Sequence, residues 1–433
     1  MKFIHLADLH LGKSLHGVNL LDSGDQPVWV DRFLALAAEL RPDAVLIAGD
    51  IYDRGAPAAG AVELLSRLLT GLTDLGVSVL IVPGNHDSAQ RLAFGRELLA
   101  REGLHIASPL RAPGKLSRVT LTDAYGPVDF WLLPYLFPAL ASEALGLELR
   151  DYDTAVRAVL DAQGLDLSRR NILIAHQNVT CGGNEGERGG SESMVGGVGQ
   201  VDYTAFEAFD YAALGHIHAG YAVGRPEVRY AGSPLCYHFN ETRQAAKGPL
   251  LVELGAKSAP VQIKLLPIEP LHRLRAVEGT FDEIRAELAD RAPFLQEADS
   301  TAASTQGANS SVPSLWGEYL SVTLTDRRVT PELAEDLRSL CESKGIFLME
   351  LSSGYQEARS VNGLTAATLR ELSLSDLFAD FYSQRSAGTE PDEAELRLLQ
   401  KAAALAEQAD LQADPDPQAI AELLQTAKTE VKK

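Results

Sequence analysis

Five short apolar runs in this chain are each followed at once by side chains that can bind a metal ion. The candidate ligands are, in chain order, Asp8 and His10 after the first run, Asp50 after the second, Asn85 after the third, His176 after the fourth, and His216 and His218 after the fifth. Carboxylate, carboxamide and imidazole ligands without thiolate suit Mn, Fe or Zn rather than a structural zinc knot or a calcium cage. Asp50 has two carboxylate oxygens and is the natural bridge between two ions. The sequence therefore predicts a site that holds two metal ions.

Each of these residues also has an ordinary structural explanation. An isolated Asp after a strand is usually a turn or N-cap residue, and a lone buried His is more often hydrogen-bonded core than metal ligand. The glycines Gly49, Gly84 and Gly215, which lie in three of the groups, can serve tight turns alone. The conjunction favours metal binding, because all five groups place metal-compatible residues directly after an apolar run.

The apolar runs are rich in Val, Ile, Leu and Ala and are expected to be strands of an α/β domain: 3–7, 44–48, 78–82, 171–175 and 211–214. Strands that are buried on both faces have such continuous apolar sequences. Helix-length amphipathic segments, such as 29–40 and 60–75, lie between them. Ligands of open α/β folds bind at the carboxyl ends of the strands, so the five groups should converge on one crevice.

The sequence pattern changes near residue 270, which predicts three regions: a catalytic domain over 1–270, a smaller α+β domain over 271–372 and a helical tail over 373–433. The expected elements of the smaller domain are strand 273–277, helix 281–289, strand 319–325, helix 331–343 and strand 346–352. Thr330 is expected to cap the second helix, with Pro331 at its first position. A Ser/Ala/Thr/Asn/Gly-rich insert at 296–314 is predicted to be disordered. The tail could form a self-packed unit or a docking surface for another chain.

The composition limits the classes of partner. The 433 residues carry a formal net charge of −20, which is evidence against a protein that coats DNA with a broad basic surface. It does not exclude DNA chemistry, because bound metal ions or a partner subunit can supply positive charge. Three cysteines without CxxC spacing fit a reducing compartment. Neither a secretory signal nor an apolar run long enough for a membrane helix is recognised, so a cytoplasmic protein without membrane contact is expected.

The ordered motifs DxH, GD, GNHD, a following His and GHxH resemble the signature of the calcineurin-like metallophosphoesterases over the first half of the chain. DLHLGKSLHG, GNHDSAQRLAFG and YAGSPLCYHFNE further resemble a bacterial branch of DNA nucleases that work with a coiled-coil ATPase. This resemblance implies a two-sheet α/β sandwich with helices outside. It also implies a small capping domain that presents DNA to the site, C-terminal helices that bind the ATPase, and a homodimer to which a helix over 91–101 could contribute.

The resemblance also implies roles for individual residues. One ion is expected at Asp8, His10, Asp50 and His218, and the other at Asp50, Asn85, His176 and His216, with Mn as the implied metal. His86 is expected to stabilise the transition state or to protonate the leaving oxygen, with Asp87 as the partner of its second ring nitrogen. Arg54 and Arg91 are weaker candidates for contact with substrate. Asp53 stands where archaeal and eukaryotic relatives tend to have His, whereas bacterial relatives commonly have Asp.

These expectations together predict a two-metal DNA nuclease that acts on duplex ends and hairpins. A serine/threonine protein phosphatase is an alternative, because GDIYDRG at 49–55 is close to that family's GDxVDRG motif. A small phosphodiesterase and a scaffold that has lost its metals are further alternatives. No GxxxxGK[ST] loop occurs in the chain, so any dependence on ATP must come from another protein.

Overall fold

The computed structural model describes residues 1–183, 199–243, 246–294 and 317–355. The chain divides into two compact units, Met1–Tyr355 and Gln356–Lys433. The predicted helical tail at 373–433, the end of the predicted smaller domain and the predicted disordered insert at 296–314 lie outside the described residues. No helix in the described ranges is long and apolar enough to cross a lipid bilayer.

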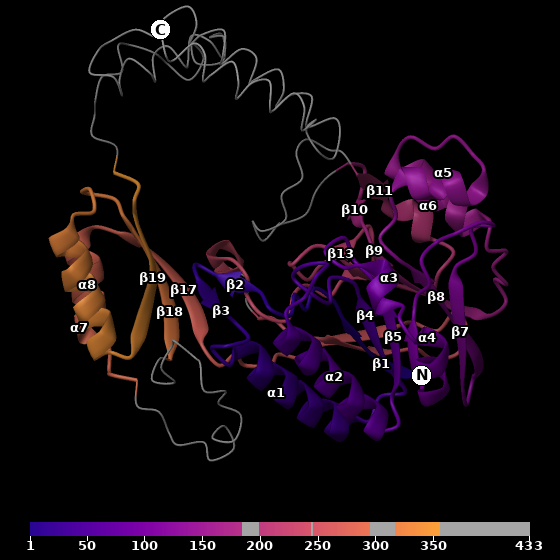
Figure 1. Cartoon of the computed structure of the whole chain (residues 1–433), viewed down its shortest axis with the longest axis horizontal. Helices are drawn as coiled ribbons and strands as arrows, with labels where there is room; N and C mark the ends of the chain where they lie inside the picture. The colour runs from indigo at the N-terminus through magenta and orange to yellow at the C-terminus, as the bar shows by residue number, and fades with distance from the viewer. Residues whose placement is uncertain (184–198, 244–245, 295–316, 356–433) are drawn as a thin grey trace, which may run out of the picture. The chain divides into compact units, whose positions relative to one another are not determined.

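The first unit contains two six-stranded sheets (Figure 1). The first sheet has the order β16 (Gln262–Leu265), β15 (Leu250–Glu253), β1 (Lys2–Leu6), β4 (Ala44–Ala48), β5 (Ser78–Val82) and β6 (Leu104–Ile106). Strands β1, β4, β5 and β6 run parallel to one another. Strand β15 pairs with β1 in the antiparallel sense, and β16 pairs with β15 in the same way. Helices α1 (Asp25–Leu40) and α2 (Ala59–Asp74) pack on the apolar face of this sheet.

The second sheet has the order β13 (Ala222–Val223), β14 (Arg225–Tyr230), β12 (Tyr211–Gly215), β9 (Arg170–His176), β8 (Gly126–Leu133) and β7 (Ser117–Asp123). Helices α5 (Pro138–Leu145) and α6 (Tyr152–Asp161) share a core with this sheet. A further core lies between the two sheets and includes Phe3, Leu46, Phe130, Ile174 and Tyr211. The predicted class, a two-sheet sandwich with helices outside, is confirmed.

Shorter elements complete this part of the chain: β2 (Ser14–Leu15), β3 (Val18–Asn19), α3 (Ala89–Leu92), α4 (Arg96–Leu99), η1 (Ala100–Glu102), β10 (Asn178–Thr180), β11 (Gln200–Asp202), η2 (Tyr203–Phe206) and η3 (Phe239–Arg243). The expectation of one helix over 91–101 is wrong. Helices α3 and α4 are separate single turns, since Gly95 adopts φ 68° in the left-handed region and ends the helical path.

A smaller α+β arrangement follows residue 272. Its parallel sheet has the order β17 (Arg273–Gly279), β18 (Glu318–Leu324) and β19 (Ile346–Ser353). Helices α7 (Phe281–Asp290) and α8 (Pro331–Ser343) lie on one face of this sheet (Figure 1) and share an apolar core with it. Thr330 caps α8 by accepting a hydrogen bond from the Leu333 amide, as its sequence predicts.

A buried polar cluster joins this smaller sheet to the start of α1. Asp25 accepts hydrogen bonds from the His272 amide at 3.2 Å and from Tyr319 Oη at 3.2 Å, and its oxygens lie 3.0 Å from His272 Nδ1. The exposed fractions are 3% for Asp25, 3% for His272 and 0% for Tyr319. Because buried polar groups must be paired, this cluster fixes one arrangement of the junction.

We expect Asp25→Ala to reduce the free energy of unfolding by about 2–4 kcal/mol, since it leaves the buried donors of His272 and Tyr319 without their acceptor. Tyr319→Phe removes only one hydrogen bond and should cost about 1 kcal/mol. Urea unfolding of the full chain measures both values. Asp22→Ala, the same change at an exposed site three residues earlier, is the control. Equal stability of the Asp22 and Asp25 variants would contradict this account of the junction.

Candidate metal centre

The five groups of predicted ligands all lie at the carboxyl ends of strands. Three groups follow β1, β4 and β5 of the first sheet, and two lie at the ends of β9 and β12 of the second. Two glycines permit the close approach of these segments. A Cβ on Gly84 would lie 2.1 Å from Asp50 Oδ1, and a Cβ on Gly215 would lie 1.8 Å from the Ala48 carbonyl oxygen. Glycine is therefore required at both positions by packing around the site.

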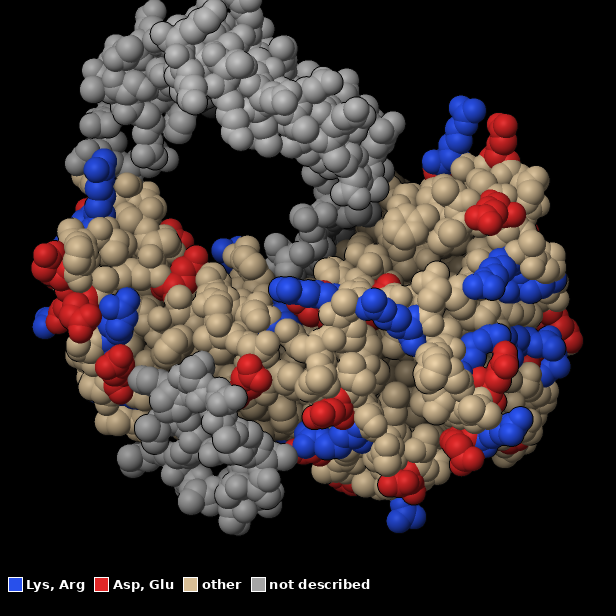
Figure 2. Space-filling model, in the orientation of Figure 1, with Lys and Arg blue, Asp and Glu red and all other residues tan. Residues whose placement is uncertain are grey.

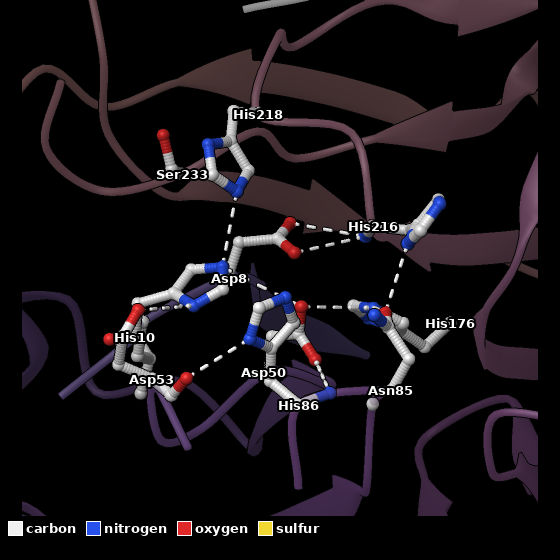
Figure 3. A network of polar contacts seen from close by, with 12 residues as sticks. Asp8, His10, Asp50, Asp53, Asn85, His86, His176, His216, His218 and Ser233 are labelled. Carbon is white, nitrogen blue, oxygen red and sulfur yellow. Dashed lines mark hydrogen bonds and ion pairs between the residues drawn. The ribbon is translucent and has the colours of Figure 1, made fainter. Parts of the chain in front are cut away.

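One side of the centre is formed by Asp8, His10 and His218 (Figure 3). The Nε2 atoms of His10 and His218 face each other at 3.1 Å, and His10 Nε2 lies 3.5 Å from Asp50 Oδ2. One ligand atom from each of Asp8, His10 and His218 lies within 4.8 Å of the others. This spacing allows all three side chains to contact one ion.

The other side is formed around Asn85. Its Oδ1 lies 3.1 Å from His176 Nε2 and 3.1 Å from His216 Nδ1. Asp50 Oδ2 lies 3.4 Å from His176 Nε2. Asp50 thus lies between the two groups of side chains (Figure 3), which is the position that a bridging carboxylate requires. The structure brings all seven predicted ligands together.

The backbone of the site is strained at several of these positions. Asp8, His10 and Asp50 have φ values of 54°, 42° and 48°, and His216 has φ 105°. Non-glycine residues rarely adopt positive φ, and each instance costs on the order of 1–3 kcal/mol. Such strain persists only where surrounding contacts hold it, and it is concentrated here at the predicted ligands.

Hydrogen bonds orient the ligands from behind. His176 Nδ1 lies 2.8 Å from the Ala48 carbonyl and donates to it, so Nε2 is the ring nitrogen that faces Asn85 and Asp50. His218 Nδ1 lies 3.1 Å from Glu241 Oε1, and Lys247 Nζ lies 2.7 Å from Glu241 Oε2. A metal-binding histidine typically has such a carboxylate or carbonyl behind its second nitrogen.

Three of the supporting residues were not identified by sequence reasoning. Glu241 ends the motif YAGSPLCYHFNE, which was the only signal that could have found it. Gln26 Nε2 donates to the His10 carbonyl at 2.8 Å, and the Tyr237 hydroxyl donates to the Leu9 carbonyl. Gln26 and Tyr237 come from α1 and from the segment before η3, and they hold the 8–10 loop in place.

Burial and mutual charge perturb the titration of this cluster. Burial raises the pKa of Asp8 to about 7, although His176 and His218 oppose the shift. Burial acts against the charged form of His176, but the Asp50 carboxylate prevails and raises the pKa of His176 to about 9. The pKa of Asp50 lies below its usual range despite burial, because His176 and His10 stabilise its charge. The cluster therefore offers a buried carboxylate to positive charge.

The donor set suits divalent cations. His10 and His218 turn ring nitrogens toward each other, and Asn85 turns its oxygen toward two further imidazoles. His10 Nδ1 is also buried without a hydrogen-bond partner in the described part of the chain. Lone pairs that face one another in a buried site are stabilised by a cation between them, and oxygen and imidazole ligands are those of Mn, Fe and Zn.

His86 is exposed and lies next to His10 and Asp50, with one ligand atom of each within 4.8 Å of the others. Its Nδ1 donates to the Asp53 carbonyl at 3.0 Å, and its amide donates to Asp50 Oδ1 at 2.9 Å. The ring is edge-on to His10 with a centroid distance of 4.9 Å. Because Nδ1 is engaged, Nε2 is the nitrogen that can exchange a proton with a substrate at the centre.

The expectation that Asp87 partners His86 is wrong. The Asp87 carboxylate instead accepts hydrogen bonds from the amides of Ile51 at 3.0 Å, Tyr52 at 3.0 Å and Gly84 at 2.8 Å. These three amides satisfy the oxygens of the buried carboxylate, so Asp87 is committed to the backbone and not to the His86 ring. Asp87 therefore braces the loop that carries Asp50.

The two weaker arginine candidates differ in their surroundings. Arg91 Nη1 donates to the Gly55 carbonyl at 2.7 Å and so ties α3 to the 50–55 loop. Arg54 is 82% exposed, with Nε 3.8 Å from Asp53. Asp53 also pairs with Lys13 at 3.0 Å and lies 3.6 Å from His10 Nδ1. Arg54 is the more accessible of the two to a substrate.

Comparison with known proteins places this architecture in a class. Residues 1–220 match the family model of the calcineurin-like phosphoesterases. Residues 270–386 match a model described as the type 5 capsule protein repressor C-terminal domain. The fold and the site together thus define a calcineurin-like phosphoesterase.

Two relatives narrow the class. A Staphylococcus saprophyticus protein, named as the D subunit of the nuclease SbcCD, is 32% identical over 293 residues, which is 65% of this chain and 73% of the relative. Its namesake in Staphylococcus epidermidis is 30% identical over 292 residues, with 66% and 74% covered. The chain belongs to this family of SbcCD nuclease D subunits. A solved structure, that of TT1561 from Thermus thermophilus, is similar at 12% identity with a TM-score of 0.34, covering 61% of this chain and 98% of that one.

We expect Glu241→Gln to weaken binding of divalent metal about 10- to 100-fold, since the loss of a carboxylate behind a histidine ligand typically has this effect. The reason is that a neutral amide holds the His218 ring less firmly and leaves Lys247 without its charge partner. Calorimetric titration of metal-free protein measures the change. Glu207→Gln, an exposed site outside the centre, is the control. Unchanged affinity in the Glu241 variant, with its fold intact, would show that Glu241 does not position the ligand.

Proposed function

We propose that this chain is the catalytic subunit of a two-metal DNA nuclease, which hydrolyses phosphodiester bonds at duplex ends and hairpins. The observation that carries the proposal is the convergence of seven metal-compatible side chains from two sheets, with His86 beside them. Membership of the SbcCD nuclease D subunits supports DNA as the substrate. Mn is the metal that we propose for both positions.

The proposed ligand sets follow the two sides of the centre. One ion is assigned to Asp8, His10, Asp50 and His218, and the other to Asp50, Asn85, His176 and His216. Asp50 is shared because it contacts both His10 and His176. Two divalent ions bound there supply positive charge for the phosphoryl oxygens and lower the pKa of a water molecule toward neutrality.

The protein's own groups perform the remaining chemistry. In the imidazolium form, which carries a proton on both ring nitrogens, His86 gives its Nε2 proton to the departing sugar oxygen and becomes neutral, while the Asp53 carbonyl accepts the hydrogen bond from Nδ1 throughout. The hydrogen bond from the His86 amide to Asp50 fixes the distance between this acid and the ligands. Asp87 keeps the Asp50 loop in place through the backbone amides of Ile51 and Tyr52. Removal of a ligand should therefore affect metal binding, and removal of His86 should affect the rate.

A protein phosphatase is disfavoured. The motif GDIYDRG supports it only through Arg54, whose Nε lies 3.8 Å from Asp53. The named relatives are nucleases, and the family match at 270–386 accounts for a second region that a phosphatase lacks. We therefore assign the 271–372 region to a capping domain that presents DNA to the site.

The distribution of charge supports a partner protein. On the face in Figure 2, Lys and Arg side chains are interspersed with Asp and Glu and do not form a continuous basic surface. The net charge of −20 adds to this argument, since duplex DNA is held largely by counter-charge to its phosphates. We propose that an SbcC-type coiled-coil ATPase binds the 373–433 tail and supplies further DNA-binding surface.

We also propose a homodimer through the segment of α3 and α4. Phe94 is 86% exposed and Leu98 is 65% exposed, the highest values among the large apolar side chains of the described residues. Two such side chains within five residues form a surface that a second copy could cover.

The central test is Mn-dependent cleavage of linear duplex and hairpin DNA by the full chain with its ATPase partner. We expect cleavage that EDTA abolishes and that Mn restores better than Zn or Mg. Para-nitrophenyl phosphate and a phosphopeptide serve as control substrates. Phosphate release from the phosphopeptide without DNA cleavage would favour the phosphatase and refute the proposal.

His86→Ala should lower the rate of DNA cleavage about 10²- to 10⁴-fold, as expected for loss of a general acid, and should leave metal content unchanged. Elemental analysis and single-turnover cleavage measure the two properties separately. His105→Ala, a half-buried histidine on β6, is the matched control and should retain activity. A His86 variant that loses its metals would refute the role assigned to this residue.

Phe94→Asp should convert the dimer to a monomer, because it places a charge in the proposed apolar contact. Sedimentation velocity measures the mass in solution. Tyr125→Asp, which changes another exposed aromatic residue at a distant turn, is the control. A wild-type chain that is monomeric at micromolar concentration would contradict the dimer.

A further inference from the structure

A cavity of about 590 Å³ opens beside His218, where the edges of the two sheets meet. It is lined by residues of strands β14, β15 and β16, by Arg243 at the end of η3, and by residues 218–221, 231–233 and 246–247. Its polar lining includes His218, Tyr221, Arg229, Ser233, Arg243 and Lys247. Ser233 lies beside His218 (Figure 3), and His218 is the one proposed metal ligand among the lining residues, so the cavity adjoins the metal centre. We call this cavity the Arg229 pocket.

The pocket has an excess of positive charge. Lys247 is already paired, since its Nζ lies 2.7 Å from Glu241 Oε2 and donates to Ser233 Oγ and to the His218 carbonyl. Arg229 and Arg243 have no ion pair or hydrogen bond from their guanidinium groups within the described ranges. The described lining contains no Asp or Glu. Two cationic groups therefore face this space without an anion.

Arg229 makes the strongest argument for a ligand. Its Nε is buried and has no hydrogen-bond partner in the described part of the chain. A buried donor on a charged group is costly when it is left unpaired. The planar guanidinium matches the oxygens of a phosphate, and Arg is the usual residue for such recognition. In a chain with a net charge of −20, an anion is drawn to a local cluster of this kind more than to the surface at large.

We propose that the Arg229 pocket binds the phosphate of a nucleotide unit through Arg229 and Arg243. Its volume lies within the range of small-molecule sites and leaves room for more than an inorganic phosphate. The Tyr221 ring offers a surface on which a base can stack. The choice of a nucleotide rests on the proposed nuclease function. The phosphate belongs either to the DNA strand beside the cleaved bond or to a released mononucleotide.

The side chains of Lys247 and Glu241 connect the Arg229 pocket to the metal centre. Lys247 contacts the His218 carbonyl, and Glu241 contacts both Lys247 and the His218 ring. A phosphate in the pocket would therefore lie beside a proposed metal ligand, since His218 is part of the lining. This arrangement would position the strand, or retain the product, on the His218 side of the centre.

The test measures binding to metal-free full-length protein in EDTA, so that the metal centre cannot hold the probe. The probes are 5′-dAMP, inorganic phosphate and a five-nucleotide single strand without a terminal phosphate, each followed by calorimetry. We expect Arg229→Gln and Arg243→Gln each to weaken binding about tenfold, as for loss of one charge-assisted contact. Arg229→Lys should restore part of the affinity. Arg150→Gln, an exposed arginine outside the pocket, should leave it unchanged.

Arginine-dependent binding of 5′-dAMP would assign the pocket to a mononucleotide, and dependence seen only with the oligonucleotide would assign it to the strand. Either result supports the proposal. Wild-type protein that binds neither 5′-dAMP nor the oligonucleotide, whether or not it binds inorganic phosphate, or binding that both glutamine variants retain, would overturn it. Because Arg243 is exposed, its variant tests the pocket without a folding penalty. This experiment measures binding in the absence of metal, whereas the proposed nuclease function is tested by Mn-dependent cleavage. A negative result in one experiment therefore does not decide the other.

Discussion

The structure depends on lone pairs that face one another in a buried site. His10 and His218 approach with their ring nitrogens 3.1 Å apart, and Asn85 presents one oxygen to two imidazoles. Such groups repel or remain unsatisfied unless protons or cations lie between them. The strained backbone at Asp8 and Asp50 adds to the cost of holding this arrangement. Bound divalent ions would satisfy the lone pairs, and their binding free energy would offset the cost of the strained backbone. Metal affinity and the stability of the site are therefore coupled.

This constraint explains the architecture around the site. The ligands come from two separate sheets, so both must end at the same place with very little backbone separation, which Gly84 and Gly215 permit. The residues behind the ligands, Asp87, Gln26 and Glu241, make their hydrogen bonds to backbone or to a single ring. Each removes freedom from one loop. The precision of the centre therefore comes from many local restraints and not from one rigid element.

The sequence predicted the strands well because a strand buried on both faces is a continuous apolar run, and β4 and β5 have the bounds expected. The predicted ligands depend on the predicted strands, since each ligand group lies at the end of a strand. Predictions failed where the outcome depends on contacts that spacing does not encode. Asp87 is adjacent to His86 but turns to backbone amides from another loop, and Gly95 divides the helix that was expected over 91–101. Glu241 supports His218 across 23 residues, a relation that no local pattern reveals.

The charge distribution completes the physical argument. A protein that grips duplex DNA through many lysines and arginines loses affinity steeply with salt, because each phosphate contact releases counterions. This chain carries a net charge of −20 and, in the proposed scheme, contacts phosphate at few points: the metal centre and the Arg229 pocket. Few contacts give weak attraction at long range but allow geometric selection near the scissile bond. In the proposed scheme, the steep, salt-dependent part of DNA binding comes from the ATPase partner, and this chain contributes position and chemistry.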